Sequence, residues 1–161
     1  MLKQLIPLCF VLALLACNNS ISVENGESKP EISGYDSLLA DSLGADKWGM
    51  KPYVMAFLKT GRVRDIDSME AMRLQRAHLN NISRLADEGK IVVAGPFYGN
   101  KGDLRGIFIF NSNDTSEVRD LVNTDPAVQA GVFQIELVPW YGSASLRMIN
   151  ELHKRISKEE I

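Results

Sequence analysis

A histidine lies on the apolar side of a predicted helix, where an imidazole could act as a general base. On a helical wheel of residues 67–88, His78 falls on one apolar stripe between Leu74 and Ile82, opposite the charged residues. An imidazole titrates near neutral pH and can accept a proton from carbon or oxygen. The alternative is a core histidine whose ring hydrogen-bonds to a backbone carbonyl. The position on the helix is compatible with both roles.

An aspartate that directly precedes a proline is the second candidate. Asp125 and Pro126 form the usual start of a helical turn, with Asp as the N-cap and Pro at the first position, and Gly131 ends that turn. Capping by itself explains an aspartate at this position.

Other chemistry is poorly represented in the sequence. Two Cys and two His do not form a zinc pattern, and no Gly-rich phosphate loop or Ser or Cys nucleophile elbow is present, so we expect no metal and no cofactor. With 20 acidic and 18 basic residues, nucleic acid is not an expected partner. His153 lies among basic residues and is expected to be exposed and inert. Arg62 and Arg64 are expected on a solvated loop that could face an anionic ligand.

The elements that must position His78 and Asp125 follow in the order β-α-β-β-α-β. Capping boxes at 67–70 and 114–117 start two helices. Short apolar or alternating runs predict four strands, at 53–58, 91–94, 105–110 and 132–138. This order predicts an α+β protein of the ferredoxin-like type, with both helices on one face of an antiparallel sheet. A C-terminal helix is predicted over 143–158.

The second face of this sheet is expected to need a cover. The first and third strands carry apolar side chains on both sides, for example Tyr53, Met55 and Phe57 opposite Val54 and Ala56. A sheet with only one covered face should instead alternate with polar residues. We expect either a second copy of the sheet, which gives a dimeric α+β barrel, or the C-terminal helix folded back over the face.

The N-terminus has the features of an export signal. Residues 1–16 combine Lys3 with an apolar run that is short for a membrane span. The run ends in Leu-Leu-Ala before Cys17, which resembles the bacterial lipobox and predicts acylation of Cys17. The alternative is an ordinary signal peptide with Cys17 free. We expect anchoring in the bacterial cell envelope, in the outer rather than the inner membrane. Residues 17–50 are predicted to be a tether, with a short helix between 35 and 49.

The remaining domain, residues 51–142, resembles the YCII-related family. The resemblance rests on short motifs in a particular order and spacing: Arg76-Ala77-His78-Leu79, Gly89-Lys90, Gly95-Pro96, Gly106-Ile107-Phe108, Asp125-Pro126-Ala127-Val128-Gln129-Ala130-Gly131 and Pro139-Trp140. It implies a ferredoxin-like fold and a dimeric α+β barrel. It also implies that His78 and Asp125 are a catalytic pair facing a small pocket. Some relatives eliminate HCl from chlorinated aromatic compounds.

Two hypotheses follow for the function. The first is a cofactor-independent enzyme of the isomerase or lyase type, in which His78 takes a proton from a small cyclic or aromatic molecule and Asp125 orients it. The second is a non-catalytic envelope lipoprotein that binds a small molecule or a protein partner, in which the same two residues are structural.

Overall fold

A computed structural model of the chain describes residues 34–99 and 101–159. The predicted signal, the predicted acylation site Cys17 and the tether as far as residue 33 lie outside the described residues. Within them, one unit from Tyr35 onward holds every helix and strand. Its elements are α1 (Ser37–Leu43), β1 (Met50–Thr60), α2 (Ser68–Asp87), β2 (Ile91–Pro96), β3 (Leu104–Phe110), α3 (Thr115–Val122), α4 (Pro126–Gln129), β4 (Phe133–Ser143), the 3-10 helix η1 (Ala144–Met148) and α5 (Ile149–Ile156).

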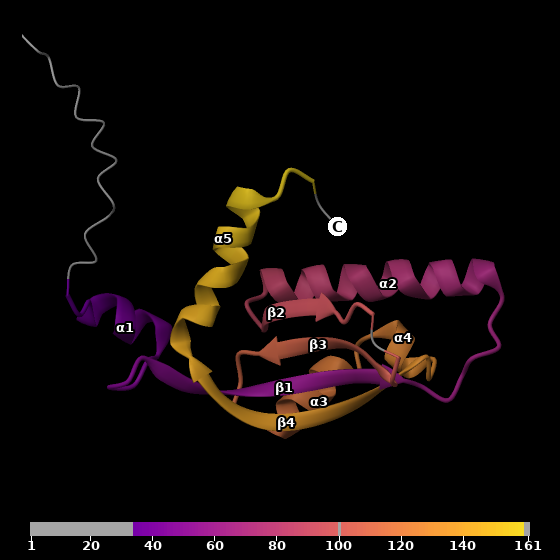
Figure 1. Cartoon of the computed structure of the whole chain (residues 1–161), viewed down its shortest axis with the longest axis horizontal. Coiled ribbons are helices and arrows are strands. Elements are labelled where there is room, and N and C mark those ends of the chain that lie inside the picture. The colour runs from indigo at the N-terminus through magenta and orange to yellow at the C-terminus, as the bar shows by residue number, and fades with distance from the viewer. Residues whose placement is uncertain (1–33, 100, 160–161) are drawn as a thin grey trace, which may run out of the picture. The chain divides into compact units, whose positions relative to one another are not determined.

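The four strands form one antiparallel sheet in the order β2-β3-β1-β4 (Figure 1). β1 is central, and it pairs along its whole length with β4, from Met50 opposite Ser143 to Thr60 opposite Phe133. The β-α-β-β-α-β order and the α+β class predicted from the sequence are therefore confirmed. Among the described residues, no helix has both the length and the apolar character that crossing a bilayer requires.

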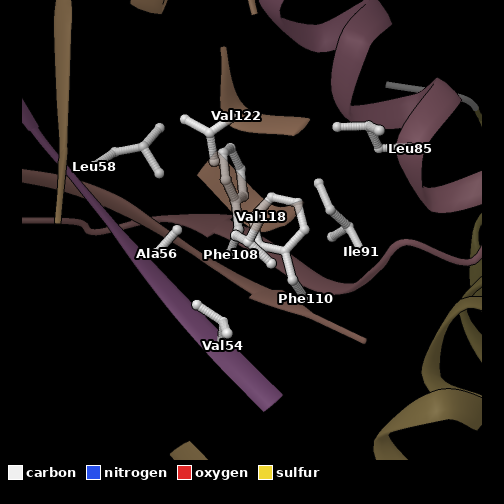
Figure 2. Close-up of a cluster of buried hydrophobic side chains, with 9 residues drawn as sticks. All are labelled: Val54, Ala56, Leu58, Leu85, Ile91, Phe108, Phe110, Val118 and Val122. Atoms are coloured by element: carbon white, nitrogen blue, oxygen red, sulfur yellow. The ribbon is translucent and has the colours of Figure 1, made fainter. Parts of the chain in front are cut away.

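One face of the sheet is covered by α2 and α3, as predicted. Figure 2 shows the cluster that joins them: strand residues of β1 and β3 meet Leu85 of α2 and two valines of α3. Phe108 and Phe110 pack edge to face, with ring centroids 6.1 Å apart. The buried members are Val54, Ala56, Leu58, Leu85, Ile91, Phe108, Phe110, Val118 and Val122. Burial of the Val, Leu, Ile and Phe side chains in this cluster stabilises the fold by about 1.5–3 kcal/mol each.

The other face is covered only in part. Leu146 of η1 packs on a small cluster of Tyr53, Val92 and Ile109. Phe57 and Ile107, further along the same face, remain half-buried. The alternative in which the C-terminal helix folds back over this face is wrong for α5. Asn150 of α5 instead donates to the backbone oxygens of Ala86 and Ile91, which holds the helix beside the end of α2 and the start of β2.

The C-terminal helix is present but differs from the single helix predicted over 143–158. Its first turn is η1, and α5 begins only at Ile149. Ala144, at the start of η1, is buried and donates its backbone N–H to the oxygen of Gly49, while the hydroxyl of Tyr53 donates to the oxygen of Ser143. These long-range contacts favour the tighter turn at this point. The short helix expected between 35 and 49 is α1, which ends at Gly44 with a φ of 69°.

Candidate active site

Helix α2 places His78 in the interior. The carboxylate of Asp67 caps the helix by accepting from the backbone N–H groups of Met69 and Glu70, both at 2.9 Å. The helix then runs for 20 residues and turns Leu74, His78 and Leu85 toward the sheet. His78 is only 7% exposed. The helical-wheel prediction of an inward-facing imidazole is therefore correct.

The turn α4 places Asp125 in the interior as well. One carboxylate oxygen of Asp125, Oδ1, accepts from the backbone N–H of Ala127 at 2.9 Å, and Pro126 occupies the first helical position. This is the capping role that the sequence predicts. Asp125 is, however, only 2% exposed, which is unusual for an aspartate whose role is capping alone.

The second carboxylate oxygen of Asp125 makes a contact that the local sequence does not show. Oδ2 lies 2.5 Å from Nδ1 of His78, a residue 47 positions earlier in the chain. Because an ionised carboxylate only accepts hydrogen bonds, Nδ1 of His78 is the donor in this contact, and in the neutral ring the lone pair then lies on Nε2. The structure thus brings together the two side chains that the sequence singled out, and it orients one by the other.

Nε2 of His78 has no hydrogen-bond partner among the described residues. No described group hydrogen-bonds to this atom, yet no buried side-chain nitrogen or oxygen among the described residues lacks a partner. Nε2 must therefore lie in the small exposed part of the residue. The ring is flanked by Phe133 and Phe108, with centroids at 5.1 and 6.1 Å. An imidazole whose Nδ1 is held by a carboxylate can accept a proton from a substrate at Nε2.

A hollow of about 340 Å³ opens close to this pair, between α3, α4 and β4. Its apolar wall consists of Val122, Val128, Phe133, Ile135 and Leu137. His78 and Asp125 do not line it, and the expectation that they face a small pocket stays a prediction. The link between the pair and the hollow is Phe133, which lines the hollow and contacts the His78 ring.

Other predicted residues are divided between this hollow and the solvent. Arg62 lines the hollow, whereas Arg64 does not, and His153 is exposed on α5 as expected. The sequence analysis missed Arg119, which also lines it. The signal was its position on α3, one helical turn before Val122. Within the described residues, no group of His, Cys, Asp and Glu could hold a metal ion.

This geometry defines a class of protein, namely a compact α+β domain with a buried His–carboxylate pair. Comparison with family sequence models makes the assignment specific. The YCII-related domain matches residues 54–141, which is more than half of the chain, and the chain belongs to this family. The family resemblance seen in the sequence motifs is thereby confirmed.

The chain is also similar to solved structures, and one of them is 5-chloro-2-hydroxyhydroquinone dehydrochlorinase from Burkholderia phenoliruptrix, solved in complex with 2,5-dihydroxybenzoquinone. The identity is 23%, the TM-score is 0.41, and the match covers 54% of this chain and 92% of that one. No functional conclusion follows at that level of similarity. No curated protein matches the chain at a significant level.

Proposed function

We propose that the domain catalyses a proton transfer of the isomerase or lyase type on a small cyclic or aromatic molecule. His78 is the general base, through Nε2, and Asp125 orients the ring through Nδ1. The observation that carries the proposal is the 2.5 Å contact between two side chains that are both more than nine-tenths buried, with Nε2 left unpartnered.

The chemistry needs only the residues of the pair. Nε2 takes a proton from a carbon or a hydroxyl of the substrate, and the resulting imidazolium is stabilised by the Asp125 carboxylate. In an isomerisation the same proton returns at another atom. In an elimination the electron pair of the broken bond forms a double bond while a leaving group departs with its own electron pair. On a substrate that the chain turns over, we expect His78→Ala to lower the rate by about 10²–10⁴-fold.

Acylation of the imidazole tests the site without an identified substrate. Diethyl pyrocarbonate modifies an unprotonated ring nitrogen that it can reach. The chain contains two histidines, so His153, exposed on α5, is an internal control. We expect native protein to be modified at both, at His78 more slowly because it is buried, as read by peptide mass spectrometry.

The matched variant is Asp125→Asn. An asparagine can donate its amide to Nδ1, which would move the ring proton to Nε2 and block the base. We expect His78 to lose most of its reactivity while His153 keeps its own. Modification of His78 only in unfolded protein would contradict the proposal. Equal reactivity of His78 in the wild type and in Asp125→Asn would also contradict it.

We further propose that the protein is a homodimer formed through the half-covered face of the sheet. Met55, Phe57 and Ile107 are apolar and half-buried there, and η1 covers only one end of that face. Sedimentation should therefore give twice the mass of the chain. Phe57→Lys, which places a charge on the open part, should give a monomer. A wild-type monomer would contradict this proposal.

The envelope location is a proposal as well, and it rests on the lipobox-like sequence before Cys17. Acylation would hold the domain at a membrane, since two or more acyl chains give stable attachment where one does not. Metabolic labelling with a fatty-acid analogue should mark the wild-type chain and not Cys17→Ser. Equal labelling of the two would exclude acylation at this residue.

A further inference from the structure

We propose that the hollow between α3, α4 and β4 is a binding site for a small organic anion with an apolar body. The acid group would lie with the guanidinium groups of Arg62 and Arg119, and the body would lie against Phe133 and Leu137. The inference does not depend on the chemistry proposed for His78, because that residue does not line the hollow.

The size and the wall of the hollow suit a ligand of this class. Small-molecule sites are commonly about 300–1,000 Å³, mainly apolar, with a few polar groups that fix orientation. The hollow has about 340 Å³, and its lining combines apolar side chains of α3, α4 and β4 with the polar side chains of Arg62, Arg119, Asn123 and Gln134. Phe133 offers an aromatic ring to that wall. A single-ring carboxylate matches the volume and this mixture of apolar and polar side chains.

The charge of the lining is of one sign. Arg62 and Arg119 are its two charged residues, and no acidic residue lines it. Within the described part of the chain, neither guanidinium group makes a hydrogen bond or an ion pair, whereas those of Arg73 and Arg84 pair with Glu70 and Glu88 on α2. Two unpaired guanidinium groups beside an apolar wall favour a carboxylate, which arginine can bind through two parallel hydrogen bonds.

A close approach of two backbone segments positions Arg62. The N–H groups of Gly61 and Val63 donate to the oxygens of Val132 and Gly131, which extends the pairing of β1 with β4. A Cβ atom at Gly61 would overlap the carbonyl oxygen of Gly131, so this approach requires glycine. Arg62 lies between these two hydrogen bonds, just after the end of β1, and its side chain lines the hollow.

The end of α3 carries partial negative charge that opposes an anion, and hydrogen bonds to its backbone oxygens reduce that opposition. At the end of α3, the oxygens of Leu121 and Val122 accept from the N–H groups of Thr124 and Asp125. The oxygen of Asn123 accepts from the Gln129 side chain at 2.7 Å. The carboxylate of Asp125 is held by His78 and by its own helix turn.

Binding of 4-fluorobenzoate to the full chain in mild detergent tests the proposal. Fluorine NMR measures this binding. We expect saturable binding with a dissociation constant in about the millimolar range. The neutral analogue 4-fluorobenzamide, of nearly the same shape, should bind about tenfold more weakly because it lacks the charge-assisted hydrogen bonds. Arg62→Gln and Arg119→Gln should each weaken the binding of 4-fluorobenzoate by about tenfold as well.

The matched control is Arg76→Gln, because Arg76 is exposed on α2 and does not line the hollow. It should leave the affinity unchanged. Both test positions are exposed, so the variants should keep the melting temperature of the wild type. The proposal is overturned by equal binding of acid and amide, by wild-type affinity in both arginine variants, or by no saturation up to about 20 mM.

Discussion

Helices α3 and α4 both begin at an aspartate cap, but the two caps lie in different surroundings. Asp114 is exposed, and its Oδ1 accepts from the N–H groups of Ser116 and Glu117 and from the Ser116 hydroxyl. Asp125 is buried, and it divides its oxygens between the N–H of Ala127 and the ring of His78. The same local motif therefore has two roles. At Asp114 it caps a helix, and at Asp125 it caps a helix and also holds a distant imidazole.

This difference shows that Asp125 has a role beyond capping α4. A cap needs one carboxylate oxygen, and α4 is a turn of only four residues. The second oxygen is available for a tertiary contact, and burial makes that contact count because water cannot replace it. An aspartate that caps a very short buried turn is thus a better site candidate than one that caps an exposed helix.

The largest expected effect is the loss of stability in Asp125→Ala. The substitution removes a cap and leaves Nδ1 of a buried imidazole without a partner, which together should cost about 2–4 kcal/mol. Asp114→Ala removes only an exposed cap and should cost clearly less. Urea unfolding of the two variants measures the difference. Equal losses would mean that the contact between His78 and Asp125 adds nothing to capping.

A double-mutant cycle sharpens the same comparison, with a smaller expected value. His78→Ala combined with Asp125→Ala should lose less stability than the two single variants added together, by about 1–3 kcal/mol, because each single change already breaks the shared contact. His78→Ala combined with Asp114→Ala should be additive, since those residues share no contact. Additivity in both cycles would remove the distinction between the two caps.

The smallest effect is the acid response of the exposed cap. The hydroxyl of Ser116, followed by the N–H groups of Ser116 and Glu117, holds the pKa of Asp114 below its ordinary value of 3.8. The folded pKa is below the unfolded one, so the stabilisation is complete above about pH 4 and is lost as the pH falls through the lowered pKa. The gap in melting temperature between wild type and Asp114→Asn should therefore narrow below pH 4. A gap that stays constant would contradict this assignment.

The sequence predicted the helix starts well and the strand ends less well. Asp67, Asp114 and Asp125 each mark a helix start because a cap is a local interaction. The predicted strands stop before Pro96 and Pro139, yet β2 and β4 include them. Both are edge strands, on which a proline can face outward without breaking the pairing. Which strands lie at the edge depends on the fold and not on the local pattern.

The candidate site was predictable in the same uneven way. The helical period of α2 identified His78, whereas its contact with Asp125 required the family resemblance, since 47 residues separate the two. The position of Arg119 one helical turn before Val122 could be read from the sequence, but its role depends on a hollow that three separate elements form. Properties of one element could be read from the chain, and properties of several elements could not.

The ring of Phe133 contacts the His78 imidazole and also lines the hollow. Linkage makes any coupling through this ring reciprocal. A ligand that binds more tightly when the imidazole is protonated must, by the same factor, raise the affinity of the imidazole for its proton. A titration of ligand affinity against pH would therefore read out the state of a residue that the ligand never touches.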